Sequence, residues 1–236
     1  QFVIVYYSSL KSVTTDLKGT AMTPLLKRLL WLFVNIRAMG ASAKPNQFEI
    51  ERKYRLSLGE FNTLLSLLEE RGFKRACKFS LTDTFLPARN KGELIRVRDQ
   101  KGSDGTCSVL TLKSWVQVAG QREREEREVD PLDRLSRSVL LIFGRRAANA
   151  TLLSYTKERE EFRAERDGLS VTAALDYTDQ LGEFSGYYLE FEVIAHDSKD
   201  VERARATIAK LVAEFLGSEE RPQAASYKDM LERSKR

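Results

Sequence analysis

Charged side chains that could bind a charged ligand recur two positions apart along this sequence of 236 residues. In the stretch FEIERKYRL, residues 48–56, Glu49, Glu51 and Lys53 alternate with other side chains. Successive side chains of a β-strand point to opposite faces, so these three share one face of a predicted strand. Carboxylates bind hard divalent cations and an ammonium group binds anionic oxygens, so the face suits an anion held together with a metal ion. A charged outer face in contact with water is the alternative that this stretch alone leaves open.

Four later segments carry like charges at the same spacing, and a fifth contributes a single lysine. They contain Arg96 and Arg98; Arg124, Glu126 and Glu128; Lys157 and Arg159; Glu190 and Glu192; and, alone, Lys113. If consecutive antiparallel strands close into a barrel with these faces inward, the lumen contains a cationic cluster and a carboxylate cluster. Buried charges need compensation, so we expect such a lumen to hold water or a ligand. A polyphosphate with Mg²⁺ or Mn²⁺ matches both clusters, whereas a sandwich with charged outer faces is the alternative.

The elements that would position these residues are mostly strands. Period-two patterns and turn residues predict strands over 48–56, 78–86, 93–99, 106–113, 121–129, 151–165, 169–178 and 187–194. A capping box formed by Ser57 and Glu60 predicts that the first strand leads into a helix ending near Gly72. Further helices are expected over 132–143 and 197–217. The fold class is therefore α+β, a closed antiparallel β-barrel with helices packed outside.

The helix predicted over 132–143 has two specific features. Asp130 followed by Pro131 suits an N-cap and a first-turn proline. Leu135, Val139 and Ile142 recur at helical spacing and are expected to form its buried stripe.

The first 46 residues differ from the rest and are predicted to lie outside the domain, which occupies 47–236. Six basic residues and one acidic residue fall in 1–46, so the 33 basic and 33 acidic residues of 47–236 balance. A domain that binds nucleic acid is expected to carry its own basic excess, so nucleic acid is not expected as a partner. The apolar stretch 29–36 is too short to span a membrane. Residues 1–46 have three interpretations: a targeting segment, an upstream extension before the true start, or an amphipathic surface helix. We favour the first two.

Composition limits the class of protein further. The chain is 42% hydrophobic and 31% charged, which is typical of a globular domain. Cys77 and Cys107 match no metal-binding spacing and are too few for a disulfide framework, so they indicate reduced thiols and a cytoplasmic protein. A single histidine, His196, argues against a histidine-ligated zinc site and a serine–histidine triad. The oligomeric state stays open, with a homodimer as one option.

The ordered motifs resemble those of one family, the CYTH domains or triphosphate tunnel metalloenzymes. Glu49-Ile-Glu51-Arg-Lys53 is similar to the family signature ExExK. The later motifs follow in the family's order: Arg96 and Arg98 as RxR, Lys113 as TxK, Arg124, Glu126 and Glu128 as RxExE, Lys157 and Arg159 as KxR, and Asp176, Leu181-Gly182, Phe184, Glu190 and Glu192 as the D…LGxF…ExE block. The resemblance covers about residues 47–231. The family includes class IV adenylate cyclases, thiamine triphosphatases and inorganic triphosphatases.

The resemblance implies a role for each group of residues. Lys53, Arg96 and Arg98 are the expected catalytic residues. The triphosphate would be bound by Lys53, Arg96, Arg98, Lys113, Arg124, Lys157 and Arg159. Mg²⁺ or Mn²⁺ would be bound by Glu49, Glu51, Glu126, Glu128, Asp176, Glu190 and Glu192. The expected substrate is a small molecule that contains a triphosphate.

Two features leave the activity open within the family. The chain between Phe184 and Glu190 is longer than usual for the family, which predicts a bulged turn before the strand that carries Glu190 and Glu192. The segment 226–231 is similar to the C-terminal segment of cyclase-like members but does not indicate the chemistry. We expect hydrolysis of inorganic, thiamine or nucleoside triphosphate. The alternatives are cyclisation of ATP to cyclic AMP and pyrophosphate, and non-catalytic binding of a polyphosphate or nucleotide.

Overall fold

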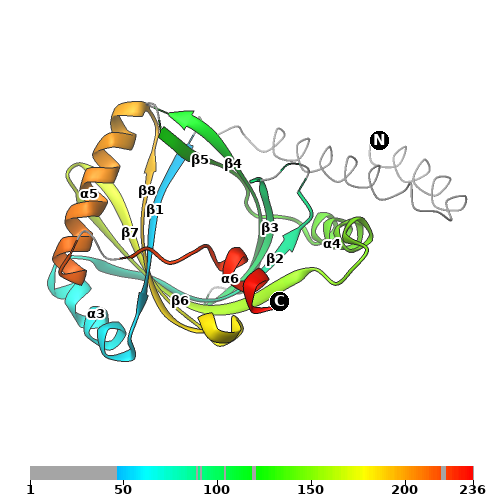
Figure 1. Ribbon diagram of the computed structural model, residues 1–236, viewed down its shortest axis with the longest axis horizontal. Helices are drawn as coiled ribbons and strands as arrows, with labels where there is room; N and C mark the ends of the chain where they lie inside the picture. The colour runs from blue at the N-terminus through cyan, green and yellow to red at the C-terminus, as the bar shows by residue number, and fades with distance from the viewer. Residues whose placement is uncertain are drawn as a thin grey trace, which may run out of the picture.

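The structure is a computed structural model that describes residues 47–88, 90, 92–103, 105–118, 121–218 and 222–235. Predictions for 1–46 concern residues outside this part of the chain. Within the described part, eight strands form one closed antiparallel barrel in the order β1-β5-β4-β3-β2-β6-β7-β8. Figure 1 shows the ring of strands, with α3, α4 and α5 outside it. The predicted fold class is confirmed.

The strands are β1 (Gln47–Leu56), β2 (Lys74–Leu86), β3 (Leu94–Gly102), β4 (Gly105–Val118), β5 (Gln121–Val129), β6 (Leu153–Arg166), β7 (Leu169–Thr178) and β8 (Gly186–Ala195). Two of them, β2 and β4, are at least four residues longer than the sequence pattern indicated, whereas β5 and β7 are as predicted. The helices are α3 (Leu58–Glu70), α4 (Arg134–Ala148), α5 (Ser198–Leu216) and α6 (Tyr227–Ser234), with a short 3₁₀ helix, η1 (Gly182–Phe184), before β8. None of the described helices is both long enough and apolar enough to cross a bilayer.

Strand β1 closes the barrel. It pairs with β8 along its length, which places Glu51 opposite Glu192 and Lys53 opposite Glu190. Its first residues also pair with β5. The charged stretch 121–129 is therefore a strand of the barrel wall, as its period-two pattern predicted.

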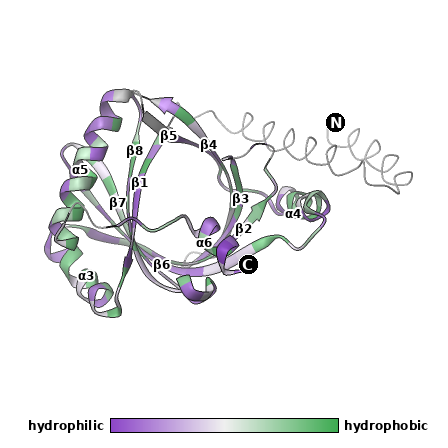
Figure 2. Cartoon of the chain, viewed as in Figure 1, coloured by the Kyte–Doolittle hydropathy of each residue, from purple (hydrophilic) through white to green (hydrophobic). Residues whose placement is uncertain are grey.

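The largest hydrophobic core lies outside the barrel. Residues on the outward face of β1, such as Ile50 and Tyr54, pack with Phe191 of β8 and with Ile208 of α5. All four side chains are almost fully buried, and burying a large apolar side chain stabilises a fold by about 1.5–3 kcal/mol. Figure 2 shows hydrophilic and hydrophobic residues intermixed along the strands of this wall. Apolar packing outside thus lets the inward face remain charged.

Helix α3 begins as predicted. Ser57 accepts a hydrogen bond from the backbone of Glu60, and the Glu60 carboxylate accepts one from the backbone of Ser57. This reciprocal arrangement is the capping box that the sequence indicated.

Helix α4 differs from its prediction in both features. It is capped by Asp133, whose Oδ1 accepts a hydrogen bond from the backbone of Ser136 at 2.9 Å, so the predicted cap at Asp130 is wrong. The predicted buried stripe is also wrong, because Leu135 and Ile142 are 57% and 53% exposed.

The buried side of α4 consists partly of small residues. Its buried residues are Ser136, Leu140, Gly144 and Ala147. A Cβ atom added to Gly144 would lie 2.6 Å from Leu86 Cδ2, so only glycine allows this close approach to β2. The hydrophobic pattern of the sequence gives little weight to glycine and serine and therefore favoured the wrong side.

The C-terminal segment enters the barrel opening. In Figure 1 residues 222–226 cross the ring of strands and lead into α6. The backbone N–H of Ala224 donates to the Lys53 carbonyl of β1 at 2.8 Å. Ser226 then caps α6, and Tyr227 is buried at its first turn.

Candidate functional site

The barrel lumen contains a cavity of about 830 Å³, which lies within the size range of small-molecule binding sites. All the predicted site residues except Asp176 line it. They are Glu49, Glu51, Lys53, Arg96, Arg98, Lys113, Arg124, Glu126, Glu128, Lys157, Arg159, Glu190 and Glu192. The inward orientation predicted from the two-residue spacing is therefore correct for these residues.

Cross-strand pairing brings opposite charges together inside the lumen. Lys113 of β4 lies opposite Glu126 of β5, and Lys53 of β1 lies opposite Glu190 of β8. Directly opposite side chains of antiparallel strands are about 5 Å apart, within reach of a salt bridge. The Lys53 Nζ to Glu190 Oε1 distance is 2.7 Å.

Asp83 of β2 organises one cationic side of the cavity, and sequence reasoning missed it. Arg98 donates to both of its carboxylate oxygens at 2.7 and 2.9 Å, and the Tyr155 hydroxyl donates to Oδ2 at 3.0 Å. Arg96 Nη1 lies 3.6 Å from Asp83 Oδ2. Burial alone would raise the pKa of the Asp83 carboxyl, but Arg98 and Arg96 hold it well below its usual range.

Arg96 retains an unused donor. Its Nη2 donates to the Thr111 hydroxyl at 3.1 Å, and that hydroxyl donates to Glu128 at 3.0 Å. Arg96 Nε is buried and has no hydrogen-bond partner among the described residues. A buried N–H without an acceptor is costly, so this donor suits an anionic oxygen supplied by a ligand.

Asp176 of β7 holds the second cationic pair. Its carboxylate accepts from Lys157 Nζ at 2.6 Å, from Arg159 Nε and Nη2 at 2.7 Å, and from the Tyr227 hydroxyl at 2.7 Å. Asp176 is 0% exposed and lies behind these cations rather than on the cavity surface. Its contacts make it a counter-ion, and its role as a metal ligand stays a prediction.

Tyr227 of α6 lies between two lysines. Lys53 Nζ is 3.9 Å and Lys157 Nζ is 4.3 Å from the centre of its ring, which are cation–π distances. The pKa of Lys157 is lowered to about 8 by burial and by the neighbouring Arg159. Burial would also lower the pKa of Lys53, but Glu190 and Glu51 raise it. The sequence carries no spacing signal that places a C-terminal tyrosine in the lumen, so this residue was missed.

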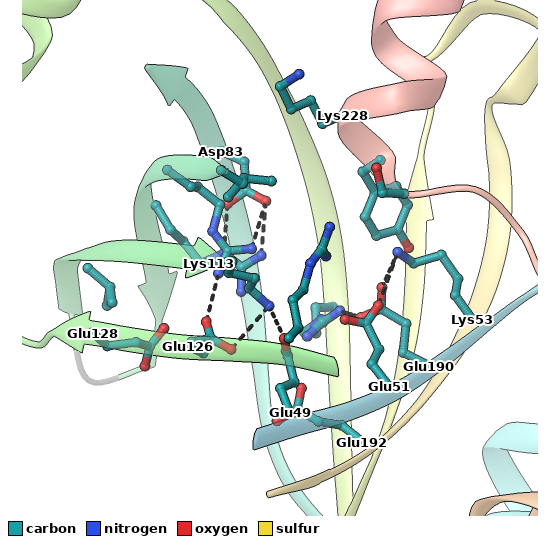
Figure 3. A pocket seen from close by; sticks show the side chains of 18 of the residues that line it. Glu49, Glu51, Lys53, Asp83, Lys113, Glu126, Glu128, Glu190, Glu192 and Lys228 are labelled. Atoms are coloured by element: carbon teal, nitrogen blue, oxygen red, sulfur yellow. Dashed lines mark hydrogen bonds and ion pairs between the residues drawn. The ribbon is translucent and has the colours of Figure 1, made fainter. Parts of the chain in front are cut away.

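Carboxylates gather on the opposite side of the lumen. Figure 3 shows Glu49, Glu126 and Glu192 close together, with the Lys113 ammonium among them. Lys113 Nζ contacts Glu49 and lies 3.1 Å from Glu126. Burial, followed by repulsion from Glu49 and Glu126, raises the pKa of Glu192 well above its usual value. Burial and Glu126 likewise raise the pKa of Glu49.

The family comparison identifies this arrangement. The profile of the CYTH domain matches residues 47–227. The chain belongs to the CYTH domain family. The resemblance drawn from the ordered motifs is thereby confirmed. No curated protein sequence matches the chain.

Solved structures share the fold of this CYTH domain. The PH1819 protein of Pyrococcus horikoshii is 21% identical, with a TM-score of 0.58 over 80% of this chain and 100% of that chain. A candidate adenylate cyclase from Vibrio parahaemolyticus is 22% identical, with a TM-score of 0.57 over 79% of this chain and 99% of that chain. The PH1012 protein of P. horikoshii is 21% identical, with a TM-score of 0.55 over 78% of this chain and 99% of that chain.

The carboxylate side has the donor chemistry that Mg²⁺ and Mn²⁺ prefer, because every candidate ligand is an oxygen. Glu49, Glu126 and Glu192 repel one another, and a divalent cation would remove that repulsion. Within the described part of the chain, however, no three acidic, histidine or cysteine side chains are already arranged around one point. Lys113 lies among these carboxylates instead. A divalent cation held by Glu49 and Glu126 would compete with Lys113 for their carboxylate oxygens.

Proposed function

We propose that the protein hydrolyses a phosphoanhydride bond of a triphosphate in a reaction that depends on Mg²⁺ or Mn²⁺. The observation that carries the proposal is the two-sided lumen, in which arginines and lysines face a group of mutually repelling carboxylates across one cavity of about 830 Å³. A triphosphate with a divalent cation would neutralise the charges of the cationic side and of the carboxylate side at once. Neither an apolar ligand nor an uncomplexed anion would do so.

The cationic residues bind and orient the triphosphate. Arg96 and Arg98 are held by Asp83, and Lys157 and Arg159 are held by Asp176, so both pairs are fixed before a ligand binds. The unused Nε of Arg96 supplies a hydrogen bond to a phosphate oxygen. Positioned cations of this kind stabilise the charge that spreads over phosphoryl oxygens in the transition state.

Glu49, Glu126 and Glu192 would hold the divalent cation, whereas Glu51 and Glu190 pair with Lys53. When bound, the cation polarises phosphoryl oxygens and lowers the pKa of water. In the balanced reaction the oxygen of water bonds to the terminal phosphorus, and the bond from that phosphorus to the bridging oxygen breaks. The bridging oxygen leaves on the diphosphate part of the substrate, and the proton of water passes to solvent or product. Inorganic triphosphate gives orthophosphate and diphosphate, whereas a nucleoside or thiamine triphosphate gives orthophosphate and the nucleoside or thiamine diphosphate.

Product analysis tests the proposal. The purified protein is given inorganic triphosphate, thiamine triphosphate or ATP with Mg²⁺ or Mn²⁺, and orthophosphate, diphosphate and cyclic AMP are separated. We expect release of orthophosphate that depends on the divalent metal. Cyclic AMP with diphosphate from ATP would assign the alternative, in which the 3′-hydroxyl is the nucleophile, as in the activity named for the V. parahaemolyticus protein. Tight binding of all three compounds without any product would show a binding module instead of an enzyme.

A further inference from the structure

A second cavity, of about 390 Å³, adjoins the lumen cavity. The two share Glu49, Glu51, Lys53, Arg124 and Ser226 along their walls. The second cavity therefore opens directly from the triphosphate site. The C-terminal segment that crosses the barrel opening forms its other side.

Trp115 of β4 is the aromatic residue of this cavity. It follows Thr111 and Lys113 on the inward face of β4, because alternate residues of a strand share a face. Thr111 and Lys113 are 0% and 5% exposed, whereas Trp115 is 42% exposed. Thr111, Lys113 and Trp115 thus form one row that leads from the charged lumen to an indole ring at its edge. Neighbouring residues of the row are about 7 Å apart, because same-face residues of a strand have that spacing.

Arg124 extends this aromatic surface. It lies directly opposite Trp115 on β5, and its guanidinium is 5.1 Å from the centre of the indole ring. An indole and a guanidinium plane can both stack a planar ring. A planar group joined to a triphosphate would therefore meet a stacking surface one side-chain row beyond Lys113.

The charges of the second cavity balance, in contrast to a phosphate site. Its charged wall residues are Glu49, Glu51, Asp229, Arg52, Lys53 and Arg124, three of each sign. The Gln223 amide and the Ser226 hydroxyl add neutral hydrogen-bonding groups. Such a cavity favours an uncharged polar ring over additional phosphate.

We propose that the second cavity binds the base of a nucleoside triphosphate, stacked on Trp115 and Arg124, while the phosphates occupy the lumen. This inference rests on the proposed function and specifies its substrate class. It excludes inorganic triphosphate as the best ligand. Stacking of a base on an aromatic side chain contributes about 1–3 kcal/mol, which corresponds to a gain in affinity of about 5- to 150-fold.

Tryptophan fluorescence tests the inference without relying on activity. The chain has two tryptophans, and a Trp31→Phe background leaves Trp115 as the reporter. In the presence of Mg²⁺, ATP is expected to quench the fluorescence strongly and inorganic triphosphate only slightly. Calorimetry of the full chain should show that Trp115→Ala weakens ATP binding about 10-fold and inorganic triphosphate binding less than 2-fold. Trp115→Phe, which keeps a ring, should retain most of the affinity for ATP.

Tyr177 provides a matched control, because it is an aromatic residue of similar exposure, 39%, that lines neither cavity. Tyr177→Ala should bind both ligands as the wild type does. Equal weakening of ATP and inorganic triphosphate by Trp115→Ala, or no effect on either, would overturn the base site and leave the proposed function intact. Failure of the wild-type protein to bind either ligand would instead overturn the proposed function.

Discussion

Replacing Asp83 by asparagine tests whether the cationic side of the lumen depends on a buried counter-ion. The side chain keeps its shape but loses the charge that faces Arg98 and Arg96, whose side chains are 14% and 12% exposed. Removing one partner of a buried ion pair costs about 3–5 kcal/mol. Because both arginines stay partly exposed to the lumen, we expect the lower end of this range, about 3 kcal/mol of unfolding free energy. For a domain of this size that corresponds to a fall in Tm of about 6–12 °C.

Asp99 provides the matched control for this prediction. It also binds an arginine through two hydrogen bonds, but its side chain and that of Arg137 are 24% and 35% exposed. Exposed ion pairs contribute about 0–1 kcal/mol, so Asp99→Asn should lower stability by less than 1 kcal/mol. Urea unfolding at pH 7 measures both variants. A loss for Asp83→Asn no larger than that for Asp99→Asn would show that the fold does not depend on Asp83 as a buried counter-ion.

The pH dependence of the Asp83→Asn effect follows from the depressed pKa of Asp83. A carboxyl whose pKa is lower in the folded state stabilises the protein above its unfolded pKa, about 4, and loses that contribution as pH falls. The difference between wild type and Asp83→Asn should therefore be constant near neutral pH and shrink below pH 4. A difference that grows on acidification would contradict the assigned ion pair.

Three further predictions concern the ligand. Glu192→Gln removes one of the crowded carboxylates, so the metal-free variant should be at least as stable as the wild type in thermal unfolding. Its metal-dependent turnover should be lost, and retained turnover would argue against Glu192 as a metal ligand. Arg96→Ala should weaken binding of inorganic triphosphate about 10-fold or more by calorimetry, since it removes charged donors, whereas Arg71→Ala, on the exposed end of α3, should have no effect. Mg²⁺ and triphosphate together, at about 100 times their dissociation constants, should raise Tm by about 5 °C or more, and triphosphate with EDTA by much less; equal shifts would indicate metal-independent binding.

The features that the sequence predicted well depend on backbone geometry. Side chains alternate along a strand, so the two-residue spacing indicated that Glu49, Lys53 and Arg96 lie on the charged faces of their strands. The closed barrel turns those faces inward. No side-chain packing detail was needed for that step. The capping box of α3 was equally local, because Ser57 and Glu60 are three residues apart.

The missed features depend on packing between distant segments. Asp83 is a single acid on a largely apolar face of β2, and its role follows from arginines on β3 and a tyrosine on β6. Tyr227 reaches the lumen only because the C-terminal segment docks on Lys53. The buried side of α4 was misjudged because Gly144 packs closely against Leu86, a contact that hydrophobic periodicity does not register.

We propose that one lumen binds a triphosphate on its cationic side and a divalent cation on its carboxylate side. A crystal structure of the protein with inorganic triphosphate and Mn²⁺ would show both ligands, because the anomalous signal of Mn²⁺ locates the metal. We expect Mn²⁺ bound by Glu49, Glu126 or Glu192, with phosphate oxygens on Arg96 Nε and on Lys113. Triphosphate bound outside the barrel, or Mn²⁺ bound away from these carboxylates, would contradict this proposal.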